Sequence, residues 1–341
     1  MKNLRIVRLT FTSPLHISNV RGDYDISERV VHSDTIYSAI IEAWNVLGLN
    51  SFIPSSNNST LGFSISSLFP FYFNKENNKF IYFLPRPASF KPSVDISINK
   101  KVKKIEYIDN EFFKELQKNG QLAIDEKNIK GSFYTQESID SSLIQSNVVS
   151  RVRVPRSQGD AQPFYTERIY FKENAGLYFF LQYESESVEI YKSLISALDY
   201  LKDEGIGTDR HIGNGMFIYE IDDNAEIIHF TGIDTEYALN LSLYIPESHE
   251  KIQKSLDEKC YFEILTRGGW ITTYPYLTLR KKYVRAIKEA SVLKTQAGIY
   301  GKIADISPDR TKLPDVFKSI HPIYRIGRAI WVPIKIQANE N

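Results

Sequence analysis

A glycine-rich segment between residues 205 and 215 restricts the fold of this 341-residue chain more than any other feature. A helical pattern precedes the segment and a strand pattern follows it. The dinucleotide-binding fingerprint needs the opposite order and a third glycine where Arg210 stands, and a P-loop needs a Gly-Lys-Ser/Thr sequence that is missing here. The glycines and the polar residues among them are Gly205, Gly207, Arg210, His211, Gly213, Asn214 and Gly215.

Two interpretations of this loop remain open. Glycine permits positive φ angles and lets backbone N–H groups come close to another molecule. Beside Arg210 and His211, such N–H groups suit the phosphodiester backbone of a nucleic acid. The alternative is a glycine-rich turn between a helix and a strand that binds no ligand.

The periodicity along the chain predicts an α+β protein of two domains. Residues 1–222 follow the order strand, helix, strands, helix, strand, and the first helix starts with Ser33 as its N-cap. Residues 223–341 repeat a similar plan, with a helix expected over 246–259. We therefore expect two ferredoxin-like units, although the sequence similarity between the halves is too weak to prove a duplication.

Residues 86–165 interrupt this plan, and we interpret them as an insertion or a projecting hairpin in the first domain. Arg151, Arg153 and Arg156 alternate with other residues, so on a strand they would share one face. Three arginines on one face could contact successive phosphates. The alternative is a solvated hairpin edge whose charges prevent aggregation.

The near-neutral net charge of +1, from 42 Lys and Arg against 41 Asp and Glu, excludes a generic cationic binder of nucleic acids. The charges are nevertheless segregated. Residues 264–296 hold seven basic residues and one acid with aromatic rings between them, whereas residues 219–250 hold eight acids and no Lys or Arg. Rings among cations suit RNA, although they can equally be core residues beside solvated charges. We predict that residues 151–156, 207–215 and 280–285 gather on one surface.

The cysteine and histidine content narrows the chemistry. Cys260 is the only cysteine, which excludes a disulfide framework and a cysteine zinc site and fits the reducing cytoplasm. The six histidines are dispersed and no apolar run reaches 18 residues, so we expect no metal, no cofactor and no membrane span. His16, after the first strand, is a candidate for acid–base catalysis, for RNA contact or for a structural role.

Four segments, in collinear order, resemble the RAMP superfamily of CRISPR proteins, and within it the family of the fourth subunit of the type III-A Csm complex. The order of a helix, a glycine-rich loop and a strand also resembles the order of elements in that superfamily. The segments are Ser13-Pro-Leu-His-Ile-Ser after the first strand, Val31-His-Ser-Asp-Thr-Ile-Tyr-Ser-Ala at the first helix, residues 154–171 in the centre and His321-Pro-Ile-Tyr-Arg-Ile-Gly-Arg-Ala near the C-terminus.

The resemblance implies two ferredoxin-like RAMP domains, the first with a thumb hairpin. It also implies a non-catalytic scaffold in antiviral defence that captures the 5′ handle of the crRNA, without a cofactor. The implied partners are the large polymerase-like signalling subunit, the adjacent backbone RAMP subunit and, through the guide duplex, target RNA. Two alternatives stay open: a metal-independent endoribonuclease that processes guides, and a protein–protein adaptor without RNA contact.

Seventeen residues are our candidates for RNA contact. They come from the loop after the first strand, the first helix, the arginine strand, the glycine-rich segment and the basic C-terminal half. They are His16, Ser33, Arg151, Arg153, Arg156, Gly205, Gly207, Arg210, His211, Gly213, Asn214, Gly215, Arg280, Lys281, Lys282, Tyr324 and Arg325.

Overall fold

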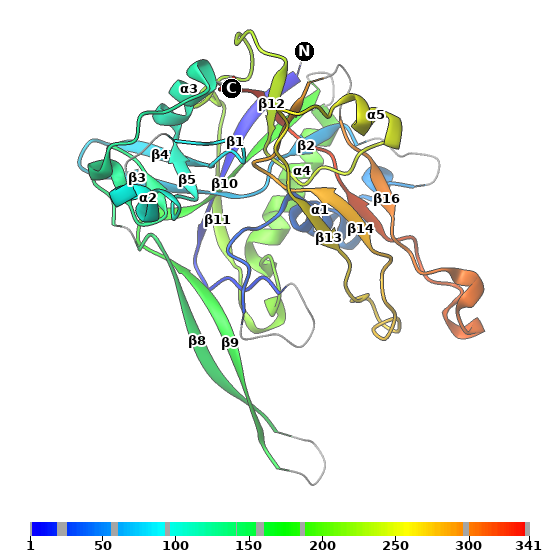
Figure 1. Ribbon diagram of the computed structural model, residues 1–341. Helices are drawn as coiled ribbons and strands as arrows, with labels where there is room; N and C mark the ends of the chain where they lie inside the picture. The colour runs from blue at the N-terminus through cyan, green and yellow to red at the C-terminus, as the bar shows by residue number, and fades with distance from the viewer. Residues whose placement is uncertain are drawn as a thin grey trace.

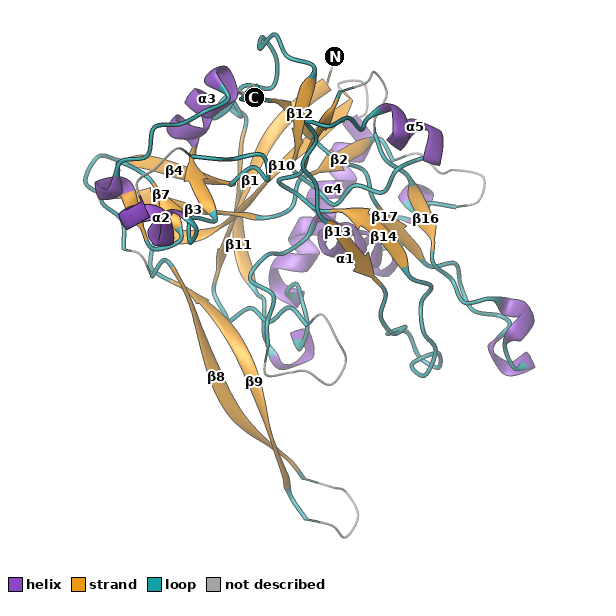
Figure 2. Cartoon of the chain, in the orientation of Figure 1, coloured by secondary structure: helices purple, strands orange, loops and turns teal. Residues whose placement is uncertain are grey.

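The computed structural model is an α+β fold with one large mixed sheet, several small sheets and few helices (Figure 1, Figure 2). It describes residues 2–18, 26–55, 61–92, 96–140, 142–154, 160–184, 188–295 and 300–337.

The first unit is a four-stranded antiparallel sheet with two helices on one face. The strands lie in the order β11–β1–β10–β2, and the chain visits them as strand, helix, strand, strand, helix, strand. That is the ferredoxin-like order, and it confirms the plan predicted for residues 1–222. The elements are β1 (Lys2–Phe11), α1 (Ser33–Val46), β2 (Phe63–Ile65), β10 (Ala175–Glu184), α4 (Val188–Glu204) and β11 (Phe217–Asp222).

The two helices bury amphipathic stripes against this sheet. In α1 the buried positions include Ile36, Ile40 and Trp44, at the spacing of one helical face. In α4 they include Leu194 and Leu198, and both helices share one apolar cluster with the facing side of β1 and β10. Burial of this face fixes α1, and with it the loops at both of its ends, on the sheet.

The predicted N-cap of α1 is wrong. The cap is His32, whose side chain makes no capping hydrogen bond, and Ser33 is already the first helical residue. The Ser33 hydroxyl is turned to another use, because it accepts a hydrogen bond of 2.9 Å from the N–H of Leu243 in the second half of the chain. Ser33 is fully buried there.

Residues 69–134 extend the large sheet rather than leaving it. The sheet continues beyond β10 in the order β3–β4–β5–β7–β6. The helix α3 starts at the N-cap Asp109, which accepts from the N–H of Phe112, and ends at Gly120 with a left-handed backbone. The elements are β3 (Phe69–Asn74), β4 (Lys79–Pro85), α2 (Ile96–Val102), β5 (Tyr107–Asp109), α3 (Asn110–Asn119), β6 (Ile129–Lys130) and β7 (Phe133–Tyr134).

A long hairpin projects from the body of the molecule (Figure 1). Its strands are β8 (Ile144–Arg153) and β9 (Gln162–Phe171), paired from Ile144–Phe171 out to Arg153–Gln162. It contacts the body through the bridge between Leu15 and Ile169 at its base and, further out, through the ion pair between Arg151 and Asp209. The interruption predicted at residues 86–165 therefore consists of two parts, a sheet extension and a projecting hairpin.

The second half consists of small sheets packed against the first unit. Among the described residues from 223 onward, α5 is the only α-helix, and it is shorter than the predicted helix over 246–259. The sheets are β15–β12–β18, β13–β14 and β16–β17. The elements are β12 (Tyr237–Asn240), α5 (His249–Lys254), β13 (Ile264–Arg267), β14 (Val284–Ile287), β15 (Val292–Lys294), β16 (Ile303–Asp305), β17 (Tyr324–Ile326) and β18 (Trp331–Pro333).

A common core joins the two halves. Leu239, Val292 and Val332 of the second half belong to the same apolar cluster as Ile6 and Phe180 of the large sheet. The predicted division between residues 222 and 223 stays a prediction. Within the described residues, no helix is long and apolar enough to cross a membrane.

Candidate nucleic-acid interface

The glycine-rich loop is folded onto its own chain. Gly205, Gly207 and Gly215 have positive φ angles of 86°, 90° and 76°. A Cβ atom on Gly215 would lie 2.0 Å from the carbonyl oxygen of Ile206, and one on Gly207 would lie 2.6 Å from that of His16. At these positions other backbone atoms lie too close for a side chain to fit, which explains the need for glycine. This close approach agrees with the interpretation of the segment as a turn. Gly213, by contrast, faces open space.

Several N–H groups of this loop are also used within the chain. Thr208 N–H donates to the carbonyl of His16 at 2.8 Å, and Gly215 N–H donates to that of Pro14 at 2.8 Å. Ile206 N–H donates to the carbonyl of Gly215. These donors hold the loop after β1 and the glycine-rich loop together, so they are not free to bind a phosphate.

His16 lies at the centre of this junction. Its side chain is fully buried, and Nδ1 lies 2.7 Å from the carbonyl oxygen of Glu167 in β9. Its Nε2 atom and the side-chain nitrogen of Asn214 are both buried without a hydrogen-bond partner within the described part of the chain. The geometry places His16 as a residue that fixes the hairpin base. RNA contact through His16 or Ser33 would have to act through the loops that these buried side chains hold.

The hairpin has a basic face and an apolar face. Arg151 and Arg153 lie on one face, and Arg151 approaches Asp209 of the glycine-rich loop at 3.6 Å. Val148 and Val152 lie on the other face, with 52% and 60% of their surface exposed. Arg153 is exposed near the tip, whereas Arg156 lies outside the described residues.

Arg210 of the glycine-rich loop contacts α1. One terminal nitrogen of its guanidinium donates to both carboxylate oxygens of Glu42, at 2.9 and 3.0 Å, a charge-assisted contact that a guanidinium also makes with a phosphate. His211 follows it in the short helix η3 (Arg210–Ile212) and is exposed.

The connection between β13 and β14 supplies a third basic segment. Arg280 is exposed, stacks on the ring of Trp270 at 4.6 Å and donates to the hydroxyl of Tyr283 at 3.3 Å. The ring of Tyr283 lies against Gly268, where a Cβ would meet it at 2.4 Å. The segment therefore presents a cation between two rings, and Lys282 beside it is exposed as well.

These segments share one end of the molecule. Figure 1 shows the hairpin and the β13–β14 connection projecting from the same side. Arg151 contacts the glycine-rich loop, Arg210 contacts Glu42, and the charge of Glu42 in turn acts on Lys281. Contacts thus join the hairpin to the glycine-rich loop and that loop to α1, and the gathering of all three basic segments on one surface stays a prediction.

One of the predicted contacts, Arg325, points inward instead. Arg325 of β17 and Arg267 of β13 both pair with Asp34 at the start of α1, and Arg267 does so with two hydrogen bonds of 3.0 and 3.2 Å. Only 1% of the Asp34 side chain is exposed. Burial would raise the pKa of Asp34, but Arg267 and Arg325 hold it below its ordinary value. Lys281 lies near this group, and burial together with Arg325 lowers its pKa.

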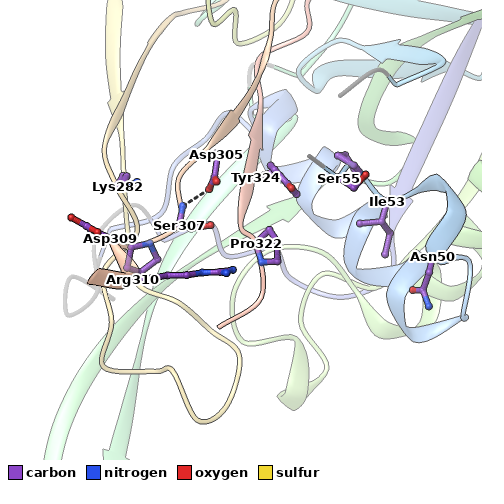
Figure 3. Close-up of a pocket in the computed structure, with 12 residues that line it drawn as sticks. Asn50, Ile53, Ser55, Lys282, Asp305, Ser307, Asp309, Arg310, Pro322 and Tyr324 are labelled. Carbon is purple, nitrogen blue, oxygen red and sulfur yellow. Dashed lines mark hydrogen bonds between the residues drawn. The ribbon is translucent and has the colours of Figure 1, made fainter. Parts of the chain in front are cut away.

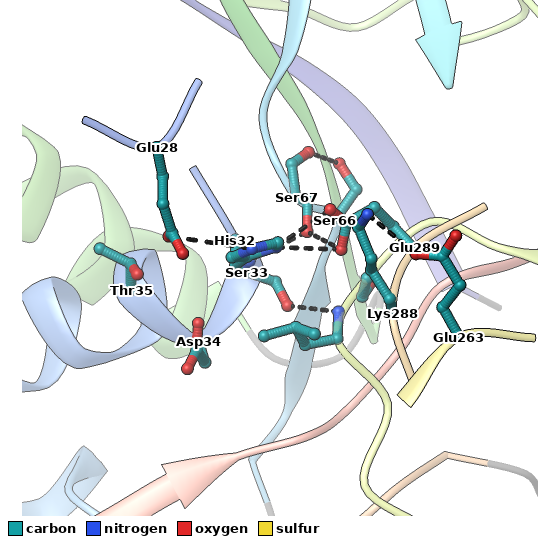
Figure 4. Close-up of polar contacts among 12 residues, drawn as sticks. Glu28, His32, Ser33, Asp34, Thr35, Ser66, Ser67, Glu263, Lys288 and Glu289 are labelled. Atoms are coloured by element: carbon teal, nitrogen blue, oxygen red, sulfur yellow. Dashed lines mark hydrogen bonds and ion pairs between the residues drawn. The ribbon is translucent and has the colours of Figure 1, made fainter. Parts of the chain in front are cut away.

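A histidine and two glutamates continue this group (Figure 4). His32 Nδ1 lies 3.0 Å from the carboxylate of Glu289, and its Nε2 lies 3.9 Å from that of Glu28. Burial would lower the pKa of His32, but the charge of Glu289 raises it. We call Glu28, His32, Asp34, Arg267, Glu289 and Arg325 the buried cluster. The sequence analysis did not predict it, because Glu289 and Arg267, which pair with His32 and Asp34, lie 257 and 233 positions further along the chain.

No metal centre is evident in the described ranges, where no three His, Cys, Asp or Glu side chains gather as ligands. Tyr324 lines an open pocket of about 720 Å³ between β17 and the short helix η1 (Asn50–Phe52), together with Lys282 (Figure 3).

Comparison with known proteins gives one consistent result. Residues 234–334 match the family described as the CRISPR Csm4 C-terminal domain. Two curated relatives are both named "CRISPR system Cms protein Csm4". The relative from Methanocaldococcus jannaschii is 24% identical over 92% of this chain and 93% of its own length, and that from Thermococcus onnurineus is 25% identical over 79% and 83%.

Solved structures of low sequence identity share the fold. A chain of the Csm3-Csm4 subcomplex of the type III-A CRISPR-Cas interference complex aligns with a TM-score of 0.61 at 23% identity, covering 98% of this chain and 100% of that one. A chain of the Csm1-Csm4 cassette in complex with pppApA aligns with a TM-score of 0.58 at 19% identity, covering 99% of both. The α+β fold expected from the sequence is thereby confirmed.

Proposed function

We propose that this chain is a Csm4-type RAMP protein of CRISPR systems and acts as a non-catalytic RNA-binding subunit of a type III-A effector complex. In this role it captures the 5′ handle of the crRNA and joins the large polymerase-like subunit to the backbone of RAMP subunits. Two similar structures contain their Csm4 chain together with Csm3 or with Csm1, and this pairing supports the bridging part of the proposal.

The observation that carries the RNA-binding part is the connected basic surface. Arg153, Arg210, Arg280 and Lys282 come from the hairpin, the glycine-rich loop and the β13–β14 connection, and Trp270 and Tyr283 lie beside Arg280. The hairpin and the β13–β14 connection project from the same side of the molecule (Figure 1). Cations supply contacts to phosphates, and exposed rings supply stacking platforms for unpaired bases. A handle is single-stranded RNA, so this combination suits it.

The placement of His16 argues for a scaffold over a nuclease. A general base must reach the proton that it removes, either directly or through one water molecule. The ring of His16 is fully buried, and its Nδ1 atom is engaged with Glu167. We therefore assign His16 the role of holding the hairpin base to the glycine-rich loop.

The acidic segment at residues 219–250 fits a protein partner better than RNA. Several of its acids already face cations of this chain: Glu220 and Asp222 pair with Arg8, and Glu236 pairs with Lys294. Asp223, Glu247 and Glu250 pair likewise with Arg5, Lys251 and Lys254, and the segment itself holds no Lys or Arg to offer a phosphate. We propose that RNA and protein partners use different sides of the subunit.

Affinity for a handle-bearing RNA tests the proposal. We expect the purified protein to bind this RNA more tightly than a scrambled RNA of equal length. Removing the exposed Arg280 should reduce the affinity and lower the slope of log K against log salt by about 1. Lys192→Ala, which removes an exposed lysine paired with Glu189 on α4, is the matched control.

Three outcomes would overturn this proposal. Binding of the handle that is unaffected by Arg280→Ala and Arg210→Ala would place RNA elsewhere, and no binding at all would favour the adaptor. Metal-independent cutting of repeat RNA by the wild-type protein, lost in His16→Ala, would favour the endoribonuclease.

A further inference from the structure

The pocket between η1 and β17 has the size and lining of a site for one small ligand. Its volume of about 720 Å³ falls in the range of ligand sites, roughly 300–1,000 Å³. Figure 3 shows two walls: Lys282, Asp305, Ser307 and Arg310 stand on one side, and Asn50, Ile53 and Ser55 stand on the other. Tyr324 and Pro322 lie between the walls.

The apolar part of the lining suits a flat ring. Tyr324 is half-buried, so its ring is held in place while part of it faces the pocket. Pro54, Pro308 and Pro322 add rigid apolar surface around it, with Ile53 on the far wall. Stacking of a nucleobase on an aromatic side chain needs this kind of platform and depends little on the identity of the base.

The cationic part suits a phosphate. Lys282 and Arg310 are both exposed and both line the pocket. One nitrogen of the Arg310 guanidinium donates to the carbonyl of Ile320 at 2.7 Å, which fixes the side chain and leaves its other donors for a ligand. A fixed guanidinium beside a lysine is a suitable receptor for a phosphate oxygen.

Two acids in the same wall serve the loop that carries them. Asp305 accepts from the N–H of Ser307, and Asp309 accepts from the N–H and the hydroxyl of Thr311. The hydrogen bonds from Thr311 lower the pKa of Asp309, and those from Ser307 outweigh burial to lower that of Asp305. Both are therefore carboxylates at neutral pH. They direct a phosphate towards Lys282 and Arg310, and they can accept from a ribose hydroxyl or a base amine.

We infer that this pocket binds one nucleotide, with its base against Tyr324 and the prolines and its phosphate at Lys282 and Arg310. Two sources supply that chemistry: a free mononucleotide, or one unstacked nucleotide of a bound RNA. The second source rests on the proposed function, whereas the first does not depend on it.

The free source is tested with AMP and UMP. We expect saturation-transfer NMR on the full-length protein to detect the base protons of either nucleotide. The dissociation constant should rise about tenfold in Tyr324→Ala and in the double variant Lys282→Ala/Arg310→Ala. Lys318→Ala is the matched control, because this exposed lysine of the same lobe pairs with Asp315 and does not line the pocket.

The RNA source is tested with handle RNAs that carry a single abasic position. At one position, the abasic substitution should weaken binding to the wild-type protein about tenfold. The same substitution should leave the affinity of the Tyr324→Ala variant almost unchanged. This coupling supports the pocket even if free nucleotides do not bind. The inference is overturned if neither free nucleotides nor any abasic position respond to Tyr324→Ala and Lys282→Ala/Arg310→Ala while the handle still binds. Failure of the handle itself to bind would contradict the proposed function, and AMP and UMP alone would then decide about the pocket.

Discussion

Arginines of this protein divide into two groups, one in the buried cluster and one on the outer surface. Arg267 and Arg325 meet Asp34 with about one-tenth of their side chains exposed. Arg210 meets Glu42 with more exposure on both sides, at 23% and 52%. A buried pair cannot exchange its partner for a ligand without exposing a charge to an apolar interior, whereas a surface pair can. Burial therefore separates arginines that hold the two halves together from arginines available to RNA.

The largest expected effect comes from breaking the buried group. Asp34→Ala leaves Arg267 and Arg325 without their shared partner, so the free energy of unfolding should fall by about 3–5 kcal/mol in urea titrations. Glu42→Ala, which removes the partner of an outer arginine, should change it by less than about 1 kcal/mol. Equal effects of the two substitutions would remove the distinction between the groups.

The shape of the outer surface depends on the glycine-rich loop, and a pair of glycines tests this. Gly215→Ala combines a positive φ of 76° with a contact to the Ile206 carbonyl that backbone must move to relieve, so it should cost about 3 kcal/mol of stability. Gly213→Ala has a similar φ but open space, and should cost about 1 kcal/mol. Thermal or urea unfolding of both variants measures the difference. Equal losses would show that the close approach is unimportant.

The pH dependence of stability tests the difference between the two groups further, because the buried cluster contains a histidine. The pKa of His32 is raised in the folded protein, so the stability that its ion pair contributes is fully present below the ordinary value near 6.5. It is lost as pH rises through the folded-state pKa. A charged hydrogen bond of this kind contributes about 1.5–3 kcal/mol. Wild-type protein and His32→Asn should therefore differ in urea stability at pH 6 and converge at alkaline pH, and a constant difference would contradict the assignment.

The smallest effect concerns RNA affinity. Glu42→Gln removes the carboxylate that occupies the Arg210 guanidinium, and the affinity for RNA should rise about threefold in filter binding at fixed salt. Glu189→Gln, at a helix-surface pair on α4, is the control for the change in net charge. Unchanged or weaker binding in Glu42→Gln would mean that Arg210 does not contact RNA.

Local periodicity predicted the first unit well because each of its elements carries its own signal. The stripe of Ile36, Ile40 and Trp44 indicates a helix without knowledge of what it packs against. The basic segments were likewise visible as runs of Lys and Arg. The sequence did not show which cations turn inward. Lys281 and Lys282 are neighbours in sequence, but only Lys281 points towards the buried cluster.

The errors share a cause in contacts between distant segments. Ser33 has the sequence context of an N-cap, but its hydroxyl serves Leu243, some two hundred residues away. Asp34 has the context of a helix-dipole residue, but its partners are Arg267 and Arg325. Polar residues at a helix start have the same local signature whichever of these uses applies, so a single sequence cannot separate them.

The strand β1 lies inside the large sheet, next to the edge strand β11, and it must wait for its partners during synthesis. β1 is the first strand made, yet both of its neighbours, β10 and β11, begin only at Ala175 and Phe217. At ribosomal speeds of about 5–20 residues per second, β1 waits roughly 10–30 s for its first partner. During that time the strand offers two unpaired edges to other chains. Because β1 lies between two strands that are made much later, a nascent chain halted before β10 leaves β1 without either of its partners.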